Sequence, residues 1–116
     1  MIKSIEVGGD KDLHNGTSYH GMTIIASRKH LTDLFGEPKK GSIDGKVKYL
    51  WEFICKDENN GVFGVTLYDW KFSKVVTEMA RINWNIGAKN EMQAKMFMDY
   101  LKTKYNLEAE EYYSDL

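Results

Sequence analysis

The stretch KVKYLWEFICKDENNGVFGVTLYDWK, residues 46–71, decides the expected fold. Apolar and polar side chains alternate along KVKYLWEFICKD and again along GVFGVTLYDWK, which is the period of two that marks a half-buried β-strand. The intervening ENNG is made of residues that favour tight turns. Two such strands joined by a short Asn/Gly-rich turn predict an antiparallel hairpin.

One face of this hairpin is expected to belong to the core. Its candidate core side chains are Val47, Tyr49, Trp51, Phe53, Cys55, Phe63, Val65 and Leu67. Successive side chains of a strand point to opposite faces. Trp70 has the opposite parity to Leu67, so we expect Trp70 to face outward.

Strands and helices are predicted on both sides of the hairpin. Further strands are expected at residues 2–7, 19–26 and 81–87. Ser27 as N-cap, Gly36 at the C-terminus and Pro38 beyond it delimit a short helix. A second helix starts after Asn90, which has a capping-box spacing to Gln93. Its apolar stripe is Ala94, Phe97, Met98, Leu101 and Tyr105.

The predicted fold class is α+β, with the order β-α-β-β-β-α and, when residues 2–7 are included, an extra N-terminal strand. The economical architecture is a three- or four-stranded antiparallel sheet with both helices on one face. Residues 1–116 make one domain, with 1–18 as an extension of strand and loop and 107–116 as an acidic tail. The tail is expected to fray or to dock on a neighbour. Residues 72–80 are predicted as a long loop or one helical turn.

Composition excludes some classes of partner. The chain has 16 basic and 17 acidic residues, and a net charge of −1 gives no basic excess for binding duplex nucleic acid. No apolar run approaches the length of a membrane span, and no signal peptide is recognisable. The single cysteine, Cys55, is expected to be a buried small hydrophobe. We therefore expect a cytoplasmic protein with no membrane contact.

Motifs for catalysis and metal binding are weak. GEPKKGS at 36–42 has the spacing of a phosphate-binding loop but lacks its lysine, and DENNG at 57–61 departs from a calcium loop. Residues 10–14 offer oxygen and nitrogen ligands, although such loops are usually only solvated. We expect no metal and no cofactor. A small enzyme built around His20, Asp69 and Glu52 is kept as an alternative.

The aromatic residues near two strand ends form the candidate ligand site. Tryptophans on three successive strands predict a stacking platform for a base, with lysine or arginine for phosphate. The alternative is that Trp51 and Trp84 only fill the layer between sheet and helices. The candidate ligand-binding residues are Tyr68, Asp69, Trp70, Lys71, Trp84, Asn85, Lys89, Arg81 and His20.

Four segments carry a resemblance to a known group of proteins. LFGEP (34–38), WEF (51–53), LYDWK (67–71) and WNIGAKN (84–90) resemble small accessory proteins of tailed phages and large DNA viruses. The resemblance implies action by binding in the host cytoplasm, often against antiviral defence.

Two binding functions follow from that resemblance. The first is a non-enzymatic protein that sequesters a nucleotide-like small molecule. The alternative is an inhibitor or adaptor that binds a host protein through an aromatic patch and the acidic tail, Glu108 to Asp115. A homo-oligomer is expected in either case.

Overall fold

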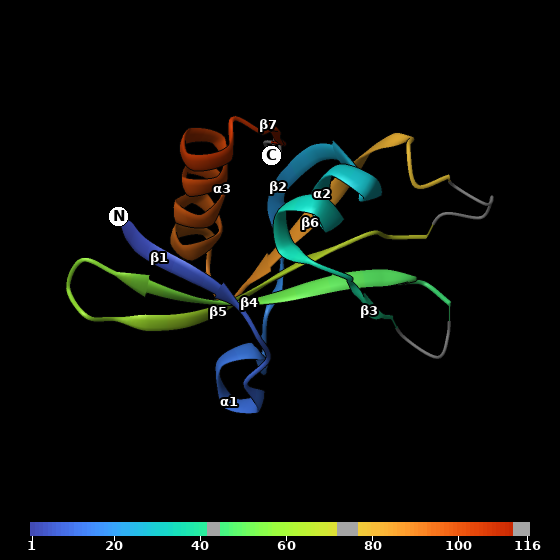
Figure 1. Cartoon of the computed structure of the whole chain (residues 1–116). Coiled ribbons are helices and arrows are strands. Elements are labelled where there is room, and N and C mark those ends of the chain that lie inside the picture. Colours follow the sequence, from blue (N-terminus) through green and yellow to red (C-terminus); the bar gives the residue numbers. More distant parts are fainter. Residues whose placement is uncertain (42–44, 72–76, 113–116) are drawn as a thin grey trace.

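The computed structural model describes residues 1–41, 45–71 and 77–112 (Figure 1). The strands are β1 (Ile2–Val7), β2 (Ser18–Ser27), β3 (Lys39–Lys40), β4 (Tyr49–Asp57), β5 (Val62–Tyr68), β6 (Arg81–Ala88) and β7 (Glu108–Glu111). The helices are α1 (Lys11–His14), α2 (Arg28–Phe35) and α3 (Glu91–Tyr105). None of these helices is both long and apolar enough to cross a membrane.

The predicted architecture is wrong, because it has too few strands and too few helices. The described residues form a seven-stranded antiparallel sheet in the order β1-β4-β5-β6-β2-β7, with β3 also paired to β4, and they contain three helices. The sequence pattern missed β3, α1 and β7. Each is two to four residues long, too short to display a period of its own.

The largest correction to the prediction from sequence concerns the acidic tail. We predicted a frayed segment or one docked on a neighbouring molecule. Residues Glu108–Glu111 instead pair with β2 of the same chain, Ile24 opposite Ala109 and Thr23 opposite Glu110. Unpaired backbone groups on β2 provide the template for this strand, and hydrogen bonding along an edge requires no apolar pattern.

The predicted hairpin is confirmed. β4 and β5 pair antiparallel, with Trp51 opposite Leu67 and Phe53 opposite Val65, and all four side chains are at most 1% exposed. The turn between the strands is closed by Asp57, whose Oδ1 accepts the backbone N–H groups of Asn59 and Gly61. The alternating pattern therefore identified both the pairing and its core face.

Both predicted helix starts are confirmed. Ser27 Oγ accepts the N–H of His30 at the start of α2, and Asn90 Oδ1 accepts the N–H of Gln93 at the start of α3. α2 ends at Gly36, whose φ of 86° suits a residue without a side chain. The buried side chains of α3 are Ala94, Phe97, Met98 and Leu101.

The two faces of the sheet are covered differently. Figure 1 shows α2 and α3 on one side and α1 on the other. α1 packs against β5 at Gly64, where a Cβ atom would lie 2.8 Å from the carbonyl oxygen of Leu13. We call the face opposite α3 the outer face. Across β6, β2 and β7, no helix of the described segments covers it.

Candidate binding surface

A row of side chains crosses the outer face from β4 to β7. In the strand register, Leu50 lies opposite Tyr68, Tyr68 opposite Asn85, Asn85 opposite Thr23, and Thr23 opposite Glu110. Paired residues of a sheet point to the same face. Residues distant in sequence therefore form one continuous row over five strands.

Exposed aromatic side chains lie along this row. Tyr19, Trp70 and Tyr112 are 42%, 44% and 52% exposed, and Tyr68 is partly buried between them. The ring centroids of Tyr68 and Trp70 are 6.3 Å apart in an edge-to-face arrangement. We call Tyr19, Tyr68, Trp70 and Tyr112 the aromatic face. The exposure of Trp70 confirms the parity argument from the sequence.

The β7 end of the aromatic face is ordered by polar contacts. Glu110 Oε2 accepts hydrogen bonds from Asn83 Nδ2 at 2.8 Å and from the Tyr112 hydroxyl at 3.0 Å. Asn83 Nδ2 also lies 3.0 Å from Thr23 Oγ1. Three neighbouring strands thereby hold the Glu110 carboxylate in place, at an end of the surface that carries negative charge.

All three tyrosines of the aromatic face are neutral at physiological pH. Burial raises the pKa of Tyr68, against an opposing hydrogen bond with Asn85. Burial also raises the pKa of Tyr19, with Tyr68 and Glu110 nearby adding to the effect. The hydrogen bond to Glu110 raises the pKa of Tyr112. Each hydroxyl therefore keeps its proton, which Tyr112 already donates to Glu110 in a hydrogen bond.

Beside Trp70 the outer face is hollowed. The hollow is shallow and open, has a volume of about 290 Å³, and is lined by Val47, Leu50, Thr66, Tyr68 and Trp70. Most of this lining is apolar. Its size and shape suit one inserted side chain better than a whole nucleotide, which needs an enclosed pocket.

Two of the predicted ligand residues lie on the core side instead. Trp84 is 1% exposed and its Nε1 donates to the Ala26 carbonyl oxygen at 3.0 Å. Asp69 is 4% exposed, and its Oδ1 accepts the backbone N–H groups of Lys48 at 2.8 Å and Tyr49 at 3.1 Å. Its carboxylate thus ties the end of β5 to the start of β4.

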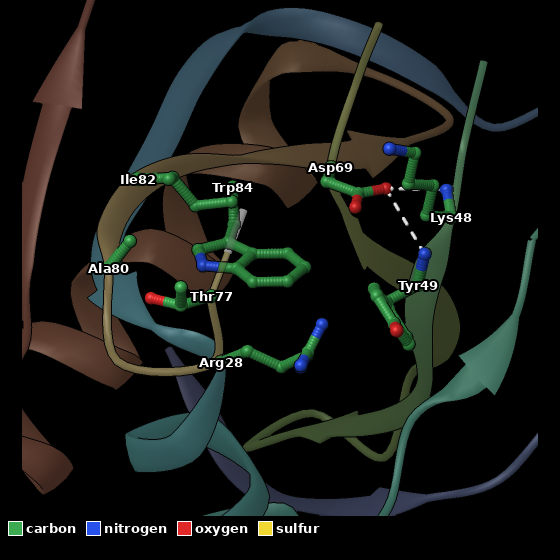
Figure 2. Close-up of a pocket in the computed structure, with 8 residues that line it drawn as sticks. All are labelled: Arg28, Lys48, Tyr49, Asp69, Thr77, Ala80, Ile82 and Trp84. Carbon is green, nitrogen blue, oxygen red and sulfur yellow. Dashed lines mark hydrogen bonds between the residues drawn. The ribbon is translucent and has the colours of Figure 1, made fainter. Parts of the chain in front are cut away.

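Asp69 and Trp84 line a small cavity with Arg28 (Figure 2). Figure 2 shows the Arg28 side chain extending between the Trp84 indole and the Tyr49 ring. The Arg28 guanidinium carbon lies 4.1 Å from the centre of the Tyr49 ring, a cation–π contact. The remaining space of about 20 Å³ fits a single water molecule. A base cannot stack on Trp84 in this arrangement.

Of the four remaining candidates, Lys71 lies beside the aromatic face, whereas Arg81, Lys89 and His20 have partners elsewhere. Lys71 places its Nζ 5.4 Å from the centre of the Trp70 ring, close to the aromatic face. Arg81 pairs with Glu108 at 3.0 Å, and Lys89 Nζ donates to the carbonyl oxygen of Asp12 at 3.0 Å. His20 Nε2 lies 2.9 Å from the Ala88 carbonyl oxygen. Of the nine predicted residues, Tyr68, Trp70, Lys71 and Asn85 come together.

The alternative catalytic set has its own separate contacts. Glu52 Oε1 accepts from Lys39 Nζ at 2.6 Å, and its Oε2 lies 3.7 Å from His14 Nδ1. Asp69 bonds to backbone and His20 to Ala88, so no described contact joins Glu52, Asp69 and His20. Among residues 1–41, 45–71 and 77–112, no group of three or more acidic, histidine or cysteine side chains could hold a metal ion.

Sequence reasoning missed Tyr19, Tyr112 and Glu110. Tyr112 is placed by a β-bulge in β2, where Gly21 has a φ of 85° and its carbonyl oxygen accepts the Tyr112 N–H at 2.6 Å. Identifying these residues requires knowing that β7 pairs with β2. No pattern within EAEEYY signals that pairing.

Comparisons with known proteins add no relative. No family model matches the chain, and neither the curated proteins nor the solved structures provide a match.

Proposed function

We propose that this protein is a non-enzymatic accessory protein that binds and occludes another protein through its aromatic face. The observation that carries the proposal is the aromatic face, whose exposed rings Tyr19, Trp70 and Tyr112 lie along the row of paired residues that crosses five strands. Tyrosine and tryptophan are enriched at protein contact surfaces, where they supply most of the binding energy. On the resemblance to viral accessory proteins, the target is a host protein in the host cytoplasm.

The shape of the surface supports a protein rather than a nucleotide. The hollow beside Trp70 is large enough for one anchoring side chain, and Tyr112 and Glu110 add polar groups at the β7 end of the same surface. Nucleotide capture has less support, because Trp51 and Trp84 are each 1% exposed and offer no free ring face.

Tryptophan fluorescence tests the proposal directly. The chain has three tryptophans, and only Trp70 is exposed, so quenching by a small solute reports mainly on that residue. Host extract is passed over the immobilised full chain, and captured proteins are identified. A specific target is expected to be lost with Trp70→Ala, and when purified it should protect Trp70 from acrylamide quenching.

A matched control distinguishes binding through the aromatic face from nonspecific binding to any exposed apolar side chain. Met92 is an exposed apolar residue, 73% exposed, on α3 and away from the outer face. Met92→Ala should retain the target that Trp70→Ala loses. Equal capture by the two variants would refute the proposal. So would nucleotide quenching of wild-type fluorescence that disappears in Trp70→Ala, because it would restore the small-molecule hypothesis.

A further inference from the structure

We infer that Asn15 is a site of spontaneous covalent modification, at which the folded chain deamidates through attack by the backbone nitrogen of Gly16. The chain contains two Asn-Gly steps, Asn15-Gly16 and Asn60-Gly61. Glycine after asparagine favours this reaction, because no side chain hinders the attacking nitrogen. The fold leaves the first step open and closes the second. The modification needs no partner and is independent of the proposed function.

The reaction balances with water as its only other reactant. The Gly16 nitrogen gives up its proton and bonds to Asn15 Cγ, while the bond from Cγ to the side-chain nitrogen breaks and ammonia leaves with that proton. The product is a cyclic succinimide, which water opens at either of its two carbonyl carbons. Opening at Cγ leaves an aspartate at position 15. Opening at the backbone carbonyl leaves an isoaspartate, through whose side chain the backbone then runs.

The reacting groups are accessible at the end of α1. Asn15 and Gly16 are both exposed, and a Cβ atom on Gly16 would meet nothing within 4 Å. Asn15 N–H donates to the Lys11 carbonyl oxygen at 3.0 Å, and Thr17 N–H to the His14 carbonyl oxygen at 3.3 Å. The Gly16 N–H between them has no partner in the described part of the chain. The attacking nitrogen therefore has no hydrogen bond within the protein to break.

The second Asn-Gly step is closed by Asp57. Gly61 N–H donates to Asp57 Oδ1 at 2.8 Å, and the Gly61 carbonyl oxygen accepts from Asp57 N–H at 2.9 Å. Hydrogen bonds to a carboxylate are stronger than those between neutral groups. The nitrogen must also lose its proton to react, and a neighbouring negative charge disfavours a second one. The hairpin turn thus protects the same dipeptide that the end of α1 exposes.

Modification at Asn15 changes both the charge and the backbone length just before β2. Either product adds a carboxylate to a chain whose net charge is already −1. The isoaspartate also lengthens the backbone by a methylene group shortly before Ser18, the residue that begins β2 and pairs with Ala88. Tyr19 of the aromatic face comes next. Aged protein is therefore heterogeneous in the segment that leads into the aromatic face.

Peptide mapping of the aged, full-length protein tests the inference. Trypsin places the two steps in separate peptides, 12–28 and 57–71, and Asn15 is the only asparagine in the first. The folded chain is incubated in mildly alkaline buffer, and an unincubated sample digested alike corrects for reaction during digestion. Mass spectrometry should show peptide 12–28 converting to two isomeric acid forms. It should convert at least about 10-fold faster than Asn60 in peptide 57–71, the factor expected from a hydrogen bond to a charged group.

Three comparisons separate the effect of the fold from that of the dipeptide. In guanidinium chloride the two steps should react at similar rates, because Asp57 no longer holds Gly61. Asn15→Gln, which would have to close a larger ring, should leave peptide 12–28 unmodified. Asp57→Ala should accelerate the reaction at Asn60 and leave the rate at Asn15 unchanged, with circular dichroism confirming that the chain is folded.

The inference is overturned by equal rates at Asn15 and Asn60 in the folded wild-type chain. It is also overturned if peptide 12–28 keeps its amide in the folded chain but loses it in guanidinium chloride, because the end of α1 would then be protective. A folded Asp57→Ala chain in which Asn60 still resists deamidation would contradict the role given to the carboxylate.

Discussion

The indole rings of Trp51 and Trp84 meet in the core with their centroids 5.3 Å apart and their planes at 68°. Each ring also donates its N–H to a carbonyl oxygen, Trp51 to Gly36 at 2.8 Å and Trp84 to Ala26 at 3.0 Å. Trp51 thereby ties β4 to the end of α2, and Trp84 ties β6 to β2. These two tryptophans fix the relative positions of sheet and helix.

The two buried tryptophans are expected to contribute far more to stability than Trp70. Trp84→Ala should lower the free energy of unfolding by about 3–5 kcal/mol, because it leaves a cavity and an unpaired carbonyl. Trp70→Ala should change it by less than about 0.5 kcal/mol, since that side chain is exposed. Urea denaturation of both variants measures the difference. Equal losses would contradict the placement of Trp70 on the surface.

Asp69 is expected to be structural rather than a ligand contact. Asp69→Ala leaves the N–H groups of Lys48 and Tyr49 without their acceptor and should cost about 1–3 kcal/mol of unfolding free energy. Asp69→Asn retains an oxygen that can accept the same bonds and should lose less. Chemical denaturation compares the two variants. Equal losses in Asp69→Asn and Asp69→Ala would show that the charge, which both variants remove, matters more than the acceptor oxygen that only Asn retains.

Cys55 should make the protein sensitive to alkali. Burial raises the pKa of its thiol from an ordinary value of 9.0 to about 12. Above pH 9 the unfolded chain releases the thiol proton while the folded chain retains it, so stability falls as pH rises from about 9 to about 12. The full loss attributable to this group is about 4 kcal/mol.

The matched variant for that test is Cys55→Ala, which has no titrating group. Tyrosines also ionise in this range, so the informative quantity is the difference between the two pH profiles of unfolding free energy. The gap between wild type and variant should shrink or reverse towards pH 12. Parallel profiles from pH 8 to pH 12 would show that the thiol titrates equally in both states.

The contribution of the α3 N-cap, Asn90, to the free energy of unfolding should be measurable by itself. Asn90 Oδ1 accepts the Gln93 N–H at 2.8 Å, so Asn90→Ala is expected to cost about 1 kcal/mol of unfolding free energy. Asn90→Asp keeps the acceptor and adds a negative charge near the helix N-terminus, which should hold stability level or raise it slightly. Thermal denaturation distinguishes the two. A neutral effect of Asn90→Ala would mean that water replaces the cap.

Much of the core could be predicted from the sequence, because side-chain alternation along a strand and helix capping depend only on neighbouring residues. The alternation through Trp51, Phe53 and Val65 gave the hairpin and its buried face. The same parity explains Asp69: it follows Leu67 by two positions, so it points to the core side as Leu67 does. Applied consistently, that argument removes Asp69 from the candidate site.

The rest of the surface depended on long-range pairing. Glu110 and Tyr19 approach the Tyr68 region only because β2 lies between β6 and β7, and the sequence between those strands does not specify that order. The acidic EAEE segment resembles a solvated tail, and its pairing is determined by the edge that β2 leaves open. Strand order in a sheet is therefore where sequence reasoning failed.

The position of β2 between β6 and β7 has a consequence for synthesis on the ribosome. β2 is completed at residue 27, but its partners begin at residues 81 and 108, so both of its edges emerge long before either is covered. Its apolar side chains Met22, Ile24 and Ala26 are then open to other nascent chains. Folding cannot finish until β7, which ends at Glu111, has left the exit tunnel. Slow translation of the C-terminal third should therefore lower the yield of native protein more than slow translation of the hairpin.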